Sequence, residues 1–227
     1  MTQTDPETQT ETARGPLWGR TPASQQRRRD ILLAGKKVFF ESGYQLASVD
    51  RIAEVAGTTK RTVYDHFGAK EALFAEVMAF AGGQFVGLLP SADDLPKAPA
   101  EGLRAFAARV ADLVGAPDSL RFQRLVIAEA ERHPAMGRAL YESAVLGAEQ
   151  VLARYLGACV ERGALRPHDT AATARIVLDI ATSGPRLRGL LAMPDADADP
   201  IGARALDKTI TSLTMRLAPE PPETARS

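Results

Sequence analysis

Three glycines, at positions 43, 57 and 68, constrain the fold of this chain more than any other feature. The segments around them carry apolar residues at helical spacing. Glycine tolerates the left-handed conformation that ends many helices, so each glycine marks a helix stop. The helix between positions 43 and 57 has only about two turns, and helices that short are marginal in isolation. We therefore expect a compact unit of short helices that stabilise one another by packing.

Hydroxyl residues predict where these helices begin, because a Ser or Thr side chain can accept a hydrogen bond from an unpaired amide of the first turn. We expect such caps at Ser24, at Ser48, and at Thr58 or Thr59. A fourth helix starts in KEALFAEVMAF. The first helix contains Gly35, although glycine costs about 1 kcal/mol relative to alanine in a helix interior. A close crossing by another helix would explain that glycine.

The third helix, which ends at His66 or Phe67, has two different faces. Val63 and Phe67 are four residues apart and point inward. The residues of this helix that are not needed for core packing are Lys60, Arg61, Tyr64 and Asp65. Two short helices joined by a tight glycine-containing turn and supported by a longer helix form a helix-turn-helix. Such a unit places its second short helix in the major groove of DNA.

Helical periodicity continues after residue 100, and we see no strand pattern. We expect an all-α fold: an N-terminal three-helix helix-turn-helix DNA-binding domain and a larger C-terminal helical domain. The expected divisions are a disordered tail (1–23), the DNA-binding domain (24–82), the C-terminal helical domain (83–218) and a second disordered tail (219–227). Within the larger domain we expect a loop at 90–100, helices from 101, one long helix over 136–162, a helix from 169 that Gly184-Pro185 interrupts or kinks, an acidic loop at 194–200 and a last helix over 201–217.

The charge distribution singles out the helix-turn-helix region. The formal net charge of the chain is zero, which argues against a general polyanion binder. Residues 20–70 nevertheless contain ten Lys and Arg against five Asp and Glu, whereas residues 71–227 contain seventeen against twenty. A local basic excess on a neutral chain fits an electrostatic footprint for nucleic acid.

Several other classes of protein are disfavoured by composition. Cys159 is the one cysteine, and His66, His133 and His168 are scattered, so no zinc spacing or internal disulfide is present. No apolar run exceeds five residues, and the N-terminus lacks the apolar segment of a signal peptide. We expect no metal, no cofactor, no membrane contact and a cytoplasmic location.

Residues 27–80 combine ILLAGKKVFFESGY, SVDRIAEVAG and TTKRTVYDHFGAKEALF. This combination resembles the DNA-binding domain of the TetR family of bacterial transcriptional regulators. The stretches RFQRLVIAEAERHP and SGPRLRGLL also resemble the AefR-like subgroup. The resemblance implies a two-domain homodimer in which the C-terminal domain (83–218) is the ligand-binding, regulatory and dimerisation domain. By that resemblance, the domain pairs through its last two long helices and encloses a small-molecule pocket, and the protein releases DNA when an effector binds.

The resemblance assigns roles on the third helix and next to it. Arginine can donate two hydrogen bonds to guanine, and a carboxylate can accept from cytosine N4. Base readout is assigned to Lys60, Arg61, Thr62, Tyr64 and Asp65; phosphate contact is assigned to Ser48, Tyr64, His66 and Lys70. His66 could equally be a structural histidine, and Asp65 could simply pair with a neighbouring cation. The family often has other residue types at positions 50, 61 and 65, so relatives do not predict the operator.

Candidates to line an effector pocket are Phe106, Val110, Phe122, Val126, Met136, Tyr141 and Tyr155, with plain core packing as the alternative for each. The effector would be small and apolar or amphipathic. We expect a dimeric repressor bound to a pseudo-palindromic double-stranded operator, in a bacterial cytoplasm and at the nucleoid. A regulator that answers to a protein partner, or to no signal, remains the alternative. An enzyme is disfavoured because no catalytic constellation is recognisable.

Overall fold

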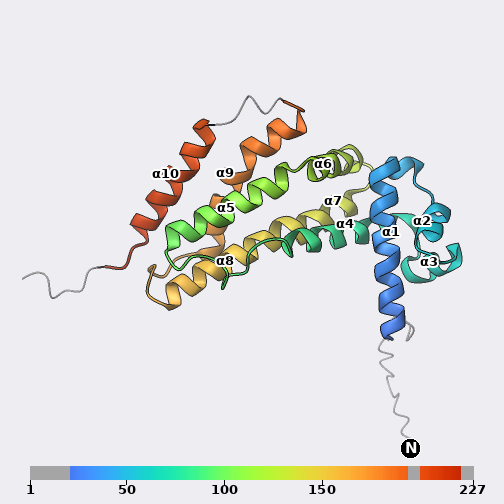
Figure 1. Ribbon diagram of the computed structural model, residues 1–227, viewed down its shortest axis with the longest axis horizontal. Helices are drawn as coiled ribbons and strands as arrows, with labels where there is room; N and C mark the ends of the chain where they lie inside the picture. Colours follow the sequence, from blue (N-terminus) through green and yellow to red (C-terminus); the bar gives the residue numbers. More distant parts are fainter. Residues whose placement is uncertain (1–20, 194–199, 221–227) are drawn as a thin grey trace, which may run out of the picture.

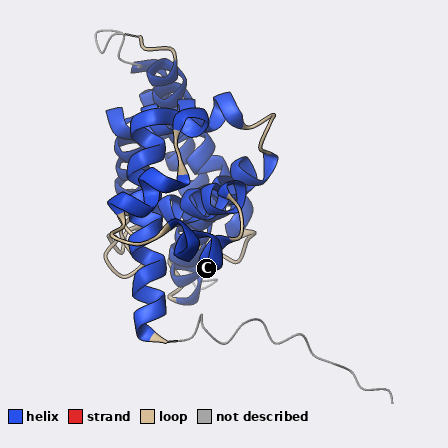
Figure 2. Ribbon diagram, turned by 90° about the vertical axis from the view of Figure 1, so that its right-hand side faces the viewer, coloured by secondary structure: helices blue, strands red, loops and turns tan. Residues whose placement is uncertain are grey.

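The computed structural model describes residues 21–193 and 200–220. Every regular element in those two ranges is helical (Figure 2). The molecule is elongated, with α1, α2 and α3 at one end and the remaining helices extending away from them (Figure 1). We call these three helices the head and the helices from α5 onward the body; α4 runs from one to the other. None of the helices in the described ranges is long and apolar enough to cross a bilayer.

The head contains α1 (Pro22–Leu46), α2 (Val49–Val55) and α3 (Lys60–Phe67), followed by α4 (Lys70–Val86). The predicted first cap, Ser24, is wrong: Thr21 caps α1 by accepting a hydrogen bond from the Ser24 amide at 3.2 Å. Pro22 explains the earlier start, since proline suits the first helical position. Gly43, the predicted stop of the first helix, instead interrupts the helical geometry inside α1, with φ 74° and ψ 173°.

The close crossing predicted at Gly35 is present. A Cβ at this position would lie 2.9 Å from Val77 Cγ2 of α4. The glycine therefore lets α1 and α4 approach each other at a distance that a larger residue would oppose.

The body consists of α5 (Pro99–Gly115), α6 (Pro117–Glu129), α7 (Pro134–Leu140), the π-helical segment η2 (Tyr141–Val145), α8 (Leu146–Glu161), α9 (Thr170–Leu190) and α10 (Pro200–Arg216). The single helix expected over 136–162 is thus interrupted by a π-helical turn. Of the interruption or kink predicted at Gly184-Pro185, the interruption does not occur: α9 continues through Pro185. Most of the acidic loop and of the two tails lies outside the described residues.

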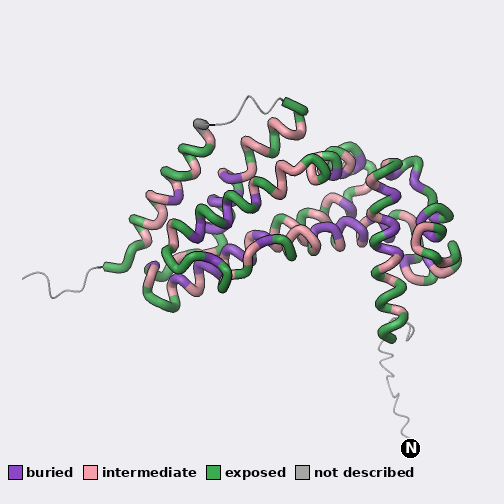
Figure 3. Tube along the Cα trace, viewed as in Figure 1, coloured by how far each residue is buried: buried purple, intermediate pink, exposed green. Residues whose placement is uncertain are grey.

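Buried residues form two hydrophobic cores. Figure 3 marks the buried positions along the helices. The first core joins the head and α4 to Phe122, Val126 and Met136 of α6 and α7. The rings of Phe40 and Phe122 lie 4.7 Å apart within it. The second core is built by α5, α8, α9 and α10 and the loop before α5. Head and body therefore share the first core.

Candidate nucleic-acid interface

The helix-turn-helix is held by two side-chain caps. Ser48 Oγ accepts from the Arg51 amide at 3.1 Å, which begins α2, and Thr59 Oγ1 accepts from the Thr62 amide at 3.2 Å, which begins α3. Gly57, between the two helices, has φ 61°. These contacts agree with the predicted cap at Ser48 and select Thr59 over Thr58.

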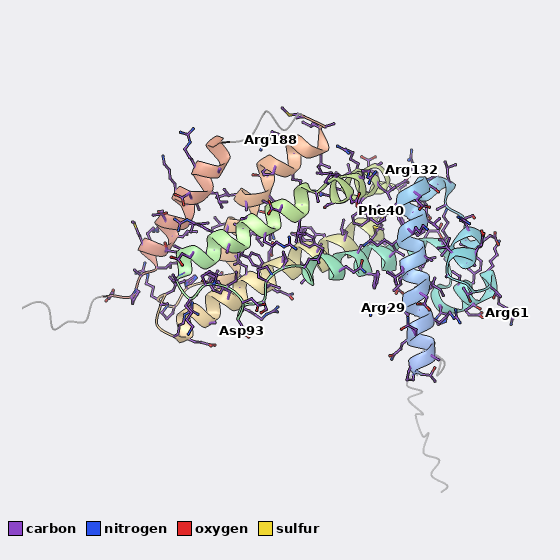
Figure 4. The ribbon with its side chains drawn as sticks, in the orientation of Figure 1. Arg29, Phe40, Arg61, Asp93, Arg132 and Arg188 are labelled. Atoms are coloured by element: carbon purple, nitrogen blue, oxygen red, sulfur yellow. The ribbon has the colours of Figure 1, made fainter. Side chains whose placement is uncertain are left out.

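The two faces of α3 separate as the sequence suggests. Val63 and Phe67 are buried in the first core, with 1% and 7% of their surface exposed. The opposite face presents Lys60, Arg61, Tyr64 and Asp65 to solvent. Arg61 lies at the far end of the head from the body, whereas Phe40 lies on the body side of α1 (Figure 4). Among the described residues, the exposed face of α3 therefore points away from the body.

The two cations at the start of α3 already have carboxylate partners. Lys60 Nζ lies 2.8 Å from Asp50 Oδ2 of α2, and this contact raises the pKa of Lys60. Arg61 Nε lies 3.9 Å from Asp65 Oδ2, one turn along α3. Both pairs are exposed, so they can exchange these partners for acceptors on DNA at little energetic cost.

Thr62 and His66 are less accessible than the four residues of the outer face. The Thr62 hydroxyl lies 2.9 Å from Thr59 Oγ1, so it takes part in the cap of α3. His66 is half-buried; burial first and the nearby Arg28 charge second lower its pKa. Its imidazole is therefore neutral near pH 7 and can donate a hydrogen bond from only one nitrogen at a time.

Lys70 begins α4 beside the end of α3. Its ammonium sits 4.4 Å from the centre of the Tyr44 ring, an attractive cation–π geometry. The Tyr44 hydroxyl donates to Glu71 Oε1 at 2.9 Å. Burial and this hydrogen bond raise the pKa of Tyr44 to about 12. Lys70 is therefore positioned by the C-terminal end of α1.

Two arginines of α1 reach the helix-turn-helix and were not among the predicted residues. Arg28 donates to the His66 carbonyl at 2.9 Å, pairs with Glu76 and lies 4.4 Å over the Phe67 ring. Arg27 donates to the Gly57 carbonyl at 3.4 Å. The run Arg27–Arg28–Arg29 is the available sequence signal, but the run does not show which arginine faces α3.

The seven candidate pocket residues do not gather in one place. Phe122, Val126 and Met136 belong to the first core. Phe106, Val110 and Tyr155 belong to the second. Tyr141 is 41% exposed and accepts a hydrogen bond from Arg175 at 2.8 Å. Within the described ranges, no group of three or more His, Cys, Asp or Glu residues is arranged to hold a metal.

Two family models match the chain. Residues 31–77 match the model described as bacterial regulatory proteins, tetR family, and residues 101–213 match the AefR-like transcriptional repressor, C-terminal domain. The first match spans the helix-turn-helix, and the second spans nearly all of the body.

Curated relatives match over shorter stretches. The HTH-type transcriptional activator FasR of Mycolicibacterium smegmatis is 40% identical over 53 residues, 23% of this chain and 24% of FasR. The HTH-type transcriptional repressor AcnR of Corynebacterium diphtheriae is 30% identical over 107 residues, 47% of this chain and 43% of AcnR. The chain thus spans less than half the length of these two relatives.

Solved structures match over most of the chain. A TetR-family transcriptional regulator from Mesorhizobium loti has a TM-score of 0.71 at 25% identity, covering 87% of this chain and 100% of that one. The Flavonoid-responsive Regulator FrrA has a TM-score of 0.65 at 25% identity, covering 85% and 96%. Both likenesses extend over head and body together.

Proposed function

The chain belongs to the TetR family of bacterial transcriptional regulators, with an AefR-like C-terminal domain, and on that premise we propose that it is a sequence-specific DNA-binding repressor. Residues 24–82 serve as the DNA-binding domain and residues 83–218 as the regulatory and dimerisation domain. The protein acts in the cytoplasm at the nucleoid. We propose repression because the matching C-terminal model is described as a repressor domain and AcnR is named a repressor. FasR is named an activator. Measuring reporter transcription with and without the protein distinguishes repression from activation.

The observation that carries the proposal is the outer face of α3. A short helix capped at Thr59 and buried through Val63 and Phe67 exposes hydrogen-bonding side chains to solvent. Lys60 and Arg61 stand at its N-terminal end, the part of a recognition helix that reaches base edges. Tyr64 and Asp65 follow on the same face, and Lys70, His66 and Ser48 flank it as phosphate contacts, with Thr62 behind the reading residues.

Selection of bound sequences from random or genomic DNA fragments tests the proposal and identifies the operator. On that operator, Arg61→Ala is expected to lose discrimination between matched and mismatched sites, about 1–3 kcal/mol at the base it reads. Lys70→Ala is expected to weaken binding to all sequences alike, since phosphate contacts carry little sequence information. Wild-type behaviour of both variants would contradict the assignment of α3.

The dimer is proposed to form through α9 and α10. Ile176, Ile180 and Leu187 follow the helical repeat along one face of α9, and Ile176 and Leu187 are 46% and 59% exposed. On α10, Met215 is 72% exposed. A two-fold contact between such faces suits a pseudo-palindromic operator with half-sites about one DNA turn, or a multiple of it, apart.

The proposed signal is a small apolar or amphipathic effector that releases the operator. FrrA is named as responsive to flavonoids, and its fold matches this chain over head and body. The alternative is a regulator without a small ligand. The seven candidate pocket residues are divided between two cores and the surface, and this division favours the alternative. A compound that raises the melting temperature and releases DNA would select the first; release only by a protein partner, or by nothing, would select the second.

A further inference from the structure

The outer surface of α2 and α3 is balanced in charge. Leaving His66 and Tyr64 aside, α2 and α3 contain three cations and three carboxylates. Each cation is paired with one carboxylate. The three pairs are Arg51 with Glu54 at 2.8 Å, Lys60 with Asp50 at 2.8 Å and Arg61 with Asp65 at 3.9 Å.

The positive excess of the head lies elsewhere. The α1 helix carries five Lys and Arg against two Asp and Glu, whereas in α4 Lys70 stands against Glu71 and Glu76. The long-range attraction to DNA therefore originates mainly in α1, while the two helices of the reading unit contribute no net formal charge apart from His66.

The pairing restrains the cations where they would meet DNA. Asp50 stands in the first turn of α2, where the helix dipole favours a carboxylate, and it holds Lys60 across the turn between the two helices. Any phosphate can attract an unpaired ammonium, and each added phosphate contact steepens the dependence of binding on salt. A paired ammonium gains less from a phosphate, because it gives up a carboxylate in exchange.

A base edge offers what a phosphate does not. Guanine presents two acceptors in fixed positions, and cytosine N4 presents a donor that a released carboxylate can accept from. The matched sequence can thus satisfy both members of a pair, whereas a phosphate can satisfy only the cation.

We propose that Asp50 and Asp65 are specificity-determining residues that neutralise Lys60 and Arg61 against the phosphate backbone and release them to the base edges of the operator. The inference rests on the proposed function, since it assumes that α3 reads DNA. The two carboxylates act by pairing with the two cations. They lower the affinity for unmatched DNA more than they lower the affinity for the operator.

The test compares Asp50→Asn, Asp65→Asn and wild type on the selected operator and on a random duplex of equal length, between 50 and 200 mM salt. Each additional phosphate contact steepens the slope of log affinity against log salt concentration by about 0.9. Over the fourfold rise in salt, each variant is therefore expected to lose about 3.5-fold more random-duplex affinity than the wild type loses. Operator affinity is expected to change less, so the ratio of operator to random affinity falls.

Matched variants separate this effect from total charge. Asp93→Asn removes the same charge from an exposed residue of the loop between α4 and α5, away from α3 (Figure 4), and is expected to behave as wild type. Asp50→Glu keeps the charge and is expected to restore the wild-type ratio. Unchanged melting temperatures confirm that the variants fold.

The proposal is overturned if Asp50→Asn and Asp65→Asn change random-duplex binding and its salt dependence no more than Asp93→Asn does, while the wild type still selects an operator. A wild type that selects no sequence would instead overturn the proposed function.

Discussion

Tyr44, near the end of α1, contacts both Lys70, a predicted phosphate contact, and His133, which precedes α7. Its ring stacks on Phe74, with centroids 4.6 Å apart, lies 4.2 Å from the His133 ring and carries the Lys70 ammonium on its face. Its hydroxyl binds Glu71, whose pKa is lowered by a hydrogen bond from its own amide and by the bond from Tyr44.

Tyr44→Phe keeps the ring and removes the hydroxyl, so it is expected to lower the free energy of unfolding by about 1 kcal/mol at pH 7. A carboxyl whose pKa is lowered on folding stabilises the protein above its unfolded pKa, and that contribution is lost as pH falls through the lower folded pKa. The difference between variant and wild type should therefore hold from pH 7 to 5 and shrink below the ordinary Glu pKa of 4.5. Urea unfolding at several pH values measures it; a constant difference down to pH 3 would contradict this account.

Arg28 supports the C-terminal end of α3 from α1. Arg28→Ala removes the hydrogen bond to the His66 carbonyl and the contact with Phe67, and is expected to cost about 1–2 kcal/mol of stability. Because the end of α3 loosens, operator affinity should fall as well. Arg29→Ala, on the exposed neighbour, is the control for stability and should leave the unfolding midpoint unchanged. Equal midpoints for the two variants would argue against the bracing role.

Residues whose role follows from helical spacing were predictable, and those whose role depends on a distant partner were not. The cap at Ser48 and the burial of Val63 and Phe67 follow from local pattern. The brace at Arg28 depends on contacts 38 and 48 residues away along the chain. The pairing of Asp65 with Arg61 was one of two readings that the sequence left open, and both readings remain compatible with the exchange proposed above.

At the scale of helices, stops were better predicted than interruptions. Gly43, Gly57 and Gly68 all have positive φ, between 61° and 75°, and each lies at a helix end or break. The π-helical turn was not foreseen, because helical spacing does not show which residues of another helix it packs against. A Cβ on Gly82 of α4 would overlap Ser143 Oγ and lie 2.9 Å from the Ala144 amide nitrogen, so η2 packs directly on that glycine.

Two adjacent glycines of α4 provide a matched test of this crossing. Gly82→Ala forces η2 away and is expected to destabilise the protein by about 1–3 kcal/mol. At Gly83 a Cβ would meet nothing within 4 Å, so Gly83→Ala is expected to stabilise the helix by up to about 1 kcal/mol. Thermal or urea unfolding of both variants measures the difference. If the two changes had the same sign, the close packing of η2 on α4 would be in doubt.

At the scale of the whole molecule, assembly is the property to test. The double variant Ile176→Glu/Leu187→Glu places two charges on the exposed stripe of α9 and is expected to yield monomers by sedimentation. Loss of the second half-site contact should then weaken operator binding by about 100-fold or more. Leu88→Glu, at a 55% exposed position just after α4, is the control. A variant that stays dimeric would place the interface elsewhere.

The all-α class and the N-terminal helix-turn-helix were within reach of the sequence, because they depend on periodicity and on one specific motif. The distribution of Phe106, Val110, Phe122, Val126, Met136 and Tyr155 between two cores was not, because apolar residues on amphipathic helices look alike until their neighbours are known.

Because head and body share the first core, the head of this regulator cannot be transferred alone to another regulator without disrupting that core. A chimera that joined residues 21–86 to the body of another regulator would lack Phe122 and Leu125 of α6, which complete the first core beside Phe40. Such a fusion should aggregate or melt early unless α6 and α7 travel with the head. The unit that can be exchanged is therefore α1 to α4 together with α6 and α7, which share the first core.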